Sequence, residues 1–127
     1  MARVLVIDDD PIVRTLVSNL LEARGHDVSV AADGRLGMKA IEASGAYDLI
    51  ITDMVMPNQE GMETIVAIRR SHPRIPVLAI SGSRTVGQRG DYLDAARMFG
   101  AAATLPKPIV PEDLVEAVER LLGKATG

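Results

Sequence analysis

Acidic side chains stand where two predicted strands end, and their chemistry favours phosphoryl transfer to a carboxylate. Asp8 and Asp9 directly follow the apolar run Val4–Ile7, and Asp53 directly follows the run Leu49–Thr52. Such runs without alternation are typical of strands that are covered on both faces. A carboxylate placed there can attack a phosphorus centre and form an acyl phosphate. Asp53 is therefore the predicted acceptor of a phosphoryl group.

A hydroxyl and an ammonium group follow the next two predicted strands. Ser81 comes after the run Val77–Ile80, and Lys107 comes after the weaker run Ala102–Leu105. In open α/β sheets, ligands bind at the carboxyl ends of the strands, so these groups should share one rim with the acids. Lys107 would neutralise phosphoryl oxygens and Ser81 would donate to one of them, which is the positioning that phosphoryl transfer needs.

Carboxylates crowded into one site also require a cation. Two like charges about 4 Å apart repel each other by roughly 4 kcal/mol at an effective dielectric constant near 20. Oxygen ligands without His or Cys favour hard cations, and Mg²⁺ retains coordination positions for phosphate. We expect Mg²⁺ at Asp8, Asp9 and Asp53, with Mn²⁺ as an alternative.

The elements that position these residues alternate along the chain. A further strand is predicted over Val28–Ala31. Helices are predicted over Pro11–Arg24, from Gly34, from Gly61 to His72, over Asp91–Phe99 and over Pro111–Leu122. Strict alternation of strand and helix predicts a parallel sheet with right-handed crossovers. The expected fold is a doubly wound α/β sandwich of three layers, with five strands and five helices, in a single domain over residues 1–127.

Finer features of the elements can be predicted as well. Asp10 is expected to cap the first helix rather than to bind a metal ion. The 3.6-residue period of that helix predicts six buried positions, Ile12, Val13, Leu16, Val17, Leu20 and Leu21. His26 and His72 lie beside Gly25 and Pro73 in predicted turns and are expected to be exposed. The polar segment 83–90 is expected to be a loop.

Composition limits the classes of partner. The net charge of −3 comes without a block of Lys or Arg, which argues against nucleic acid as a direct partner. No apolar run approaches the ~20 residues needed to cross a bilayer. Cysteine is absent, so no disulfide or thiolate zinc site is available. The expectation is a soluble, cytoplasmic protein that does not bind membranes.

Together, these features resemble the receiver domain of two-component response regulators over essentially the whole chain. Any one motif is weak evidence, but all of them occur in order and each follows a predicted strand. The resemblance rests on Asp8-Asp9, on Asp53-Met-Val-Met-Pro57 with Gly61, on Ser81, and on Lys107-Pro108. It implies a flavodoxin-like fold with the sheet order 2-1-3-4-5.

The resemblance also implies roles for the metal site. Asp53 would be the phosphorylated residue. Asp9, Asp53 and the backbone carbonyl of Val55 would bind Mg²⁺ directly, and Asp8 would act largely through metal-bound water. Lys107 would contact the phosphoryl group.

Further roles follow for the switch and for the backbone. Ser81 would move to meet the phosphoryl group. Pro57, Gly61 and Pro108 would be structural, with a cis bond before Pro108. Thr104 would be the second switch residue with Ser81, but it departs from the family pattern, because the family usually has a switching Tyr or Phe three residues before the lysine. The stretch 81–99 is also longer than is usual in the family.

Partners are likewise implied by the resemblance. A histidine kinase or a histidine phosphotransfer protein would donate the phosphoryl group. The fourth helix, fifth strand and fifth helix would then regulate a downstream protein, with a phosphorylation-dependent homodimer as an alternative. The chain would not be an enzyme beyond its own phosphorylation and dephosphorylation. A stand-alone receiver and one domain of a longer protein both stay open.

Two other functions are considered. A Mg²⁺-dependent phosphohydrolase of the haloacid-dehalogenase type would use Asp8-Asp9-Asp10 as its first motif, with Glu112 and Asp113 as its later acids. Those two acids instead resemble residues of a first helical turn. A pseudo-receiver would keep the fold as a binding module without switching, which the complete set of acids, hydroxyl and lysine argues against.

Overall fold

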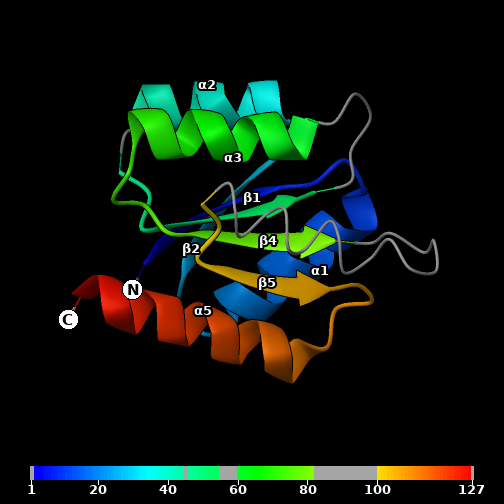
Figure 1. The fold of residues 1–127 in the computed structure, drawn as a ribbon. Coiled ribbons are helices and arrows are strands. Elements are labelled where there is room, and N and C mark those ends of the chain that lie inside the picture. Colours follow the sequence, from blue (N-terminus) through cyan, green and yellow to red (C-terminus); the bar gives the residue numbers. More distant parts are fainter. Residues whose placement is uncertain (1, 45, 55–59, 82–99, 127) are drawn as a thin grey trace.

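A parallel sheet lies between two layers of helices in the computed structural model, which describes residues 2–44, 46–54, 60–81 and 100–126 (Figure 1). The strands are β1 Arg3–Ile7, β2 Asp27–Ala31, β3 Leu49–Asp53, β4 Val77–Ser81 and β5 Ala103–Pro106. All four neighbouring pairs are parallel, and the order is β2-β1-β3-β4-β5. The predicted fold class and strand order are therefore confirmed.

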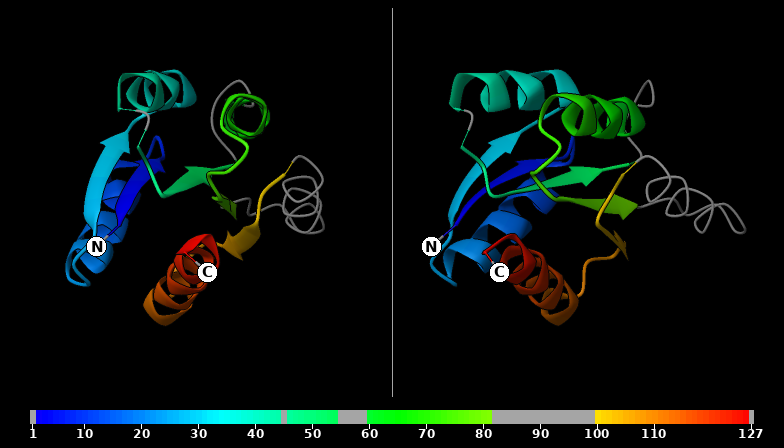
Figure 2. Two further views of the ribbon diagram at one scale, coloured as in Figure 1. Left: turned by 90° about the vertical axis from the view of Figure 1, so that its left-hand side faces the viewer. Right: turned by 60° about the vertical axis from the view of Figure 1, so that its left-hand side comes forward.

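The helices cover the sheet in pairs. They are α1 Pro11–Glu22, α2 Gly34–Ser44, α3 Glu60–Ser71 and α5 Pro111–Thr126. Figure 2 shows α2 and α3 on one face of the sheet and α1 and α5 on the other. The predicted helix over 91–99 and the predicted loop over 83–90 lie outside the described residues. None of the described helices is long and apolar enough to cross a membrane.

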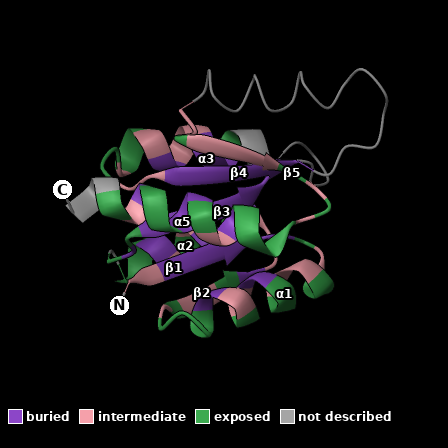
Figure 3. Cartoon of the chain, turned by 90° about the horizontal axis from the view of Figure 1, so that it is seen from below, coloured by how far each residue is buried: buried purple, intermediate pink, exposed green. Residues whose placement is uncertain are grey.

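Alternation along the strands divides the core into two halves. In β1, Val4 and Val6 pack on the α1/α5 side, whereas Leu5 and Ile7 pack on the α2/α3 side. Successive strand side chains point to opposite faces, so a strand with both faces covered must be apolar throughout. Figure 3 shows the resulting buried band along the central strands. Every residue of β3 and of β4 is buried.

Two predicted core positions of α1 are wrong. Ile12 is 76% exposed and Leu16 is 38% exposed. The stripe that faces the sheet is formed by Val13, Val17 and Leu20 together with Leu21. Ile12 and Leu16 are one turn apart beside this stripe, where their side chains do not pack against the sheet.

His26 and His72 are also less exposed than predicted. The His26 side chain is only 10% exposed, because it lies between the start of β1 and α5. The amide of Ala2 donates to its Nδ1 at 3.3 Å, and its Nε2 is 3.5 Å from Glu119 Oε2. Arg24 donates to the same Glu119 carboxylate at 3.0 Å and so lowers the Glu119 pKa. His72 is partly buried at the end of α3.

The last helix is longer than predicted. It continues past Leu122 to Thr126 and includes Gly123. Gly123 does not adopt the left-handed conformation that commonly ends helices, and a Cβ at this position would meet nothing within 4 Å. The glycine is therefore an ordinary helical residue here.

Candidate functional site

The register of the sheet brings the ends of four strands to one rim. Ile7 pairs with Thr52, Thr52 with Ala79, and Ala79 with Thr104. The next residues along these strands therefore emerge side by side, as expected for a parallel sheet.

Backbone hydrogen bonds continue this register beyond the ladder itself. The amide of Asp8 donates to Ala31 O at 3.1 Å, and the amide of Met54 donates to Ile80 O at 2.7 Å. The amide of Lys107 donates to Ser81 O at 2.8 Å. The backbone on both sides of the rim is thus fixed by the sheet rather than by loop conformation.

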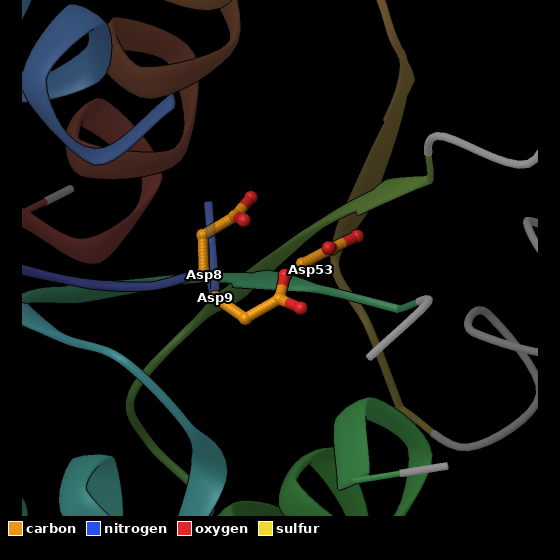
Figure 4. A group of neighbouring side chains, drawn as sticks. All are labelled: Asp8, Asp9 and Asp53. Atoms are coloured by element: carbon orange, nitrogen blue, oxygen red, sulfur yellow. The ribbon is translucent and has the colours of Figure 1, made fainter. Parts of the chain in front are cut away.

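Three carboxylates meet at this rim. One oxygen from each of Asp8, Asp9 and Asp53 can be chosen so that all three lie within 4.8 Å of one another. Asp8 and Asp53 are each 2% exposed, whereas Asp9 is exposed. Figure 4 shows Asp8 and Asp9 extending from the end of β1 and Asp53 from the end of β3.

Lys107 joins the two buried acids. Its Nζ donates to Asp53 Oδ2 at 3.3 Å and lies 3.1 Å from Asp8 Oδ2. The alternation of side chains along the strands explains the contact, because Val6, Ile51 and Leu105 face the α1/α5 side of the sheet. Asp8, Asp53 and Lys107 each lie two positions after one of these residues, so their side chains point to the same side.

Burial and charge oppose each other at these groups. Burial raises the pKa of Asp8, and the hydrogen bond from the Asp10 amide and the charge of Lys107 only partly offset it. Burial acts to lower the pKa of Lys107, but the carboxylates of Asp53 and Asp8 outweigh it and raise that pKa. The ammonium therefore stays charged between the two acids.

The segment after β1 is held by short local contacts. Asp10 caps α1, because its Oδ1 accepts from the Ile12 amide at 2.9 Å. Its own amide donates to Asp8 Oδ1 at 2.9 Å. Arg14 Nη1 donates to the backbone carbonyl of Asp8 at 2.7 Å. The cap was predicted, whereas the Arg14 contact was missed, since no sequence pattern marks a side chain that folds back onto the preceding strand end.

Two buried polar atoms at the rim have no hydrogen-bond partner in the described part of the chain. They are Asp8 Oδ2 and Ser81 Oγ. Asp8 Oδ2 lies 3.1 Å from Lys107 Nζ and forms an ion pair with it. Buried polar atoms are rarely left unpaired, so both atoms fit hydrogen-bond partners beyond those that the described residues supply.

The donor set fits a hard divalent cation. The cluster contains only carboxylates, which suit Mg²⁺ or Mn²⁺ better than Zn²⁺. Asp8, Asp9 and Asp53 are the described residues that would hold the ion. Val55, whose carbonyl was predicted as a fourth ligand, lies outside the described residues.

The remaining predicted site residues lie as follows. Gly61 is in the first turn of α3, and Pro57 lies outside the described residues. The Lys107–Pro108 bond is cis, as the resemblance implied. Thr104 lies in β5 opposite Ala79 and is partly buried.

Comparison with known proteins identifies the family of this chain. The sequence profile of the response regulator receiver domain matches residues 4–119. The chain belongs to this family. Receiver domains are signalling proteins of two-component systems rather than enzymes, and the family implies phosphorylation-dependent signalling.

Curated relatives of this receiver domain are longer proteins. Response regulator MprA of Mycolicibacterium vanbaalenii is 35% identical over 124 residues, which cover 98% of this chain and 52% of that protein. The DNA-binding transcriptional regulator NtrC of Azospirillum brasilense is 35% identical over 125 residues, which cover 98% of this chain and 25% of that protein. The chain thus spans about half of the length of the first relative and a quarter of the length of the second.

Solved structures of similar length have the same fold as this receiver domain. A receiver domain protein from Clostridium thermocellum superposes with a TM-score of 0.89 at 29% identity, covering 99% of this chain and 98% of that one. The chemotaxis response regulator CheY4 of Vibrio cholerae superposes with a TM-score of 0.83 at 31% identity, covering 95% of this chain and 98% of that one.

Proposed function

We propose that the chain is a phosphorylation-activated switch whose acceptor is Asp53. The observation that carries the proposal is the position of this buried carboxylate, within 4.8 Å of oxygens of Asp8 and Asp9 and 3.3 Å from the Lys107 ammonium group. A histidine kinase or a histidine phosphotransfer protein would donate the phosphoryl group from a phosphohistidine. Asp53 is 2% exposed, which suits the transfer of a small phosphoryl group to this carboxylate.

The chemical step is an in-line displacement. An Asp53 carboxylate oxygen attacks phosphorus, the P–N bond of the phosphohistidine breaks, and the neutral imidazole leaves after taking up a proton. Bound Mg²⁺ supplies positive charge for the phosphoryl oxygens and offsets the repulsion among the acids. Lys107 contacts the transferred group from its present place beside Asp53 Oδ2. Ser81 Oγ, which is buried and unpaired among the described residues, donates to another phosphoryl oxygen.

Phosphorylation then alters the contacts that join the strands. Lys107 is shared between Asp8 and Asp53, and its amide is bonded to Ser81 O. A phosphoryl group on Asp53 competes for the same ammonium group, so the end of β5 and the segment that leads to α5 are placed to respond. We propose the surface of β5 and α5, with the fourth helix, as the output face.

Partners of the output face are proteins in this proposal. The net charge of −3 and the lack of a block of Lys or Arg in the sequence argue against nucleic acid, so direct DNA binding is not part of the function proposed for this chain. A second copy of the chain in a phosphorylation-dependent homodimer is an alternative output. Thr104 stands where an aromatic switch is usual, so transmission is proposed to pass through Ser81 and Lys107.

The test is chemical labelling of the acceptor. Wild-type protein incubated with acetyl phosphate and Mg²⁺ should gain one phosphoryl group by intact-mass spectrometry, and EDTA should prevent it. Asp53→Asn should gain none while keeping its far-ultraviolet circular dichroism spectrum. Full labelling of Asp53→Asn would contradict the assignment of the acceptor.

The phosphohydrolase alternative has less support. Its later acids would be Glu112 and Asp113, which lie exposed in the first turn of α5. Acids there stabilise the positive end of the helix, so they have a structural reason to be present. Rapid turnover of p-nitrophenyl phosphate by the wild type would support this alternative, whereas stable labelling without turnover would exclude it. A pseudo-receiver would show no site-localised amide shifts with Mg²⁺.

A further inference from the structure

Arg14 makes a contact that the chemistry described so far does not use. Its Nη1 donates to the backbone carbonyl of Asp8 at 2.7 Å, which joins α1 to the residue that directly follows β1. The residue is partly buried in the first half of α1. A charged donor makes a shorter and stronger hydrogen bond than a neutral one.

This contact completes the fixation of Asp8. The amide of Asp8 donates to Ala31 O, and its Oδ1 accepts from the Asp10 amide. Its Oδ2 lies beside Lys107 Nζ. The carbonyl is the remaining polar group of the residue, and Arg14 holds it. These partners come from β2, from the start of α1 and from the segment after β5, so Asp8 cannot rotate without losing several of them.

The carbonyl is also the group that sets the position of Asp9. The peptide unit between Asp8 and Asp9 is planar, so the direction of the carbonyl determines where the next amide and Cα lie. Asp9 is exposed and lies just outside the regular strand, where the sheet no longer restrains it. Holding the carbonyl therefore orients the one exposed carboxylate of the cluster.

We infer that Arg14 is a positioning residue, which holds the Asp8–Asp9 peptide so that both carboxylates face a divalent cation together with Asp53. This inference rests on the proposed function, because it assigns the cluster to Mg²⁺. Partners that orient metal ligands typically change metal affinity by about 10- to 100-fold when they are removed.

Electrostatics alone predicts the opposite sign. Arg14 places a positive charge next to the backbone of the acid pair, and a like charge repels a bound cation. If the side chain acted only as a charge, its removal would tighten Mg²⁺ binding. If it acts as a positioning residue, its removal weakens Mg²⁺ binding despite the loss of that repulsion. The direction of the change therefore separates the two roles.

The experiment is a Mg²⁺ titration of the unphosphorylated protein, followed by amide chemical shifts. Arg14→Met should raise the Kd for Mg²⁺ by about 10-fold. Arg14→Lys keeps a donor of similar reach and should recover a large part of the affinity. Arg74→Met is the matched control, because it removes the same charge from an exposed residue just before β4, at the opposite end of the strands. The control should bind Mg²⁺ as the wild type does.

Two further measurements distinguish positioning from loss of structure. Urea unfolding in EDTA should show that Arg14→Lys and Arg14→Met are folded. Labelling by acetyl phosphate should be slow for Arg14→Met at low Mg²⁺ and should approach the wild-type rate at saturating Mg²⁺. If Arg14→Met does not fold, the comparison of Arg14→Lys with Arg14→Gln replaces it, and a Kd equal to wild type in both would overturn the inference.

The outcomes separate this inference from the proposed function. A wild type that binds Mg²⁺ and is labelled, with folded Arg14 variants of equal or tighter affinity, overturns the role of Arg14 alone. A wild type without a Mg²⁺ response at Asp8, Asp9 and Asp53 overturns both proposals.

Discussion

At the scale of single residues, the buried carboxyl of Asp8 lowers the stability of the fold at neutral pH. Its carboxyl is buried, and one of its oxygens accepts no hydrogen bond from the described residues. Because burial raises the pKa of Asp8 above its ordinary value of 3.8, folding favours the protonated form. The stability that protonation contributes is complete below pH 3.8 and is lost as the pH rises through the raised pKa.

The substitution Asp8→Asn tests this balance. In EDTA, the variant should match the wild type in free energy of unfolding near pH 3.5 and exceed it at pH 7, because Asn stays neutral. Urea denaturation at a series of pH values measures the difference. Asp9→Asn makes the same change of charge at an exposed position and should have a smaller effect. A variant less stable than the wild type at pH 7 would show that the ion pair with Lys107 outweighs burial.

At the scale of elements, the close approach of α2 to β1 is set by a glycine. A Cβ on Gly37 would lie 2.4 Å from Ile7 Cδ1 and 2.9 Å from Ile7 Cγ1. Ile7 is fully buried and directly precedes the acid pair. Any larger residue at Gly37 must therefore shift the Ile7 side chain, the strand end that carries it, or the helix.

Alanine substitutions at two helical glycines should have opposite effects. Gly37→Ala should lower the free energy of unfolding by about 1–3 kcal/mol, because overpacking outweighs the better helix propensity of Ala. Gly123→Ala in α5 has open space around its Cβ and should raise stability by up to about 1 kcal/mol. Urea denaturation at neutral pH measures both. Stabilisation by Gly37→Ala would mean that Ile7 repacks without strain.

The elements also explain what the sequence could and could not predict. The strand ends were predictable, because strands buried on both faces appear as uninterrupted apolar runs that stop at Asp8 and Asp53. The exposure of Ile12 was not predictable. Periodicity identifies the apolar stripe of a helix, but it does not give the width of the sheet surface against which that stripe packs. The contact between His26 and Glu119 was missed because it joins a turn to a helix far along the chain.

Side-chain contacts to the backbone were equally unpredictable. The residue types of the site could be chosen from strand ends alone, and the structure brings Asp8, Asp9, Asp53 and Lys107 together. The link from Arg14 to a carbonyl depends on the angle at which α1 leaves the strand, and that angle is set by packing on the sheet.

At the scale of the whole molecule, a cation at the rim should stabilise the fold. A ligand that binds only the folded state adds about 2.7 kcal/mol when its free concentration is 100 times its Kd. Thermal unfolding of the wild type should therefore shift upward with added Mg²⁺ and return with EDTA. Asp9→Asn should shift much less. An equal shift in that variant would place the stabilising ion elsewhere.

The register of the strands has a consequence for when the site comes into existence. Asp8 and Lys107 lie near opposite ends of the sequence and meet only because β1, β3, β4 and β5 pair in the right order. Contacts between such distant segments carry the largest loop-closure cost, so they form late in folding. A nascent or partly unfolded chain would contain every reactive side chain and still not accept a phosphoryl group. Only completely folded molecules can therefore be phosphorylated at this site.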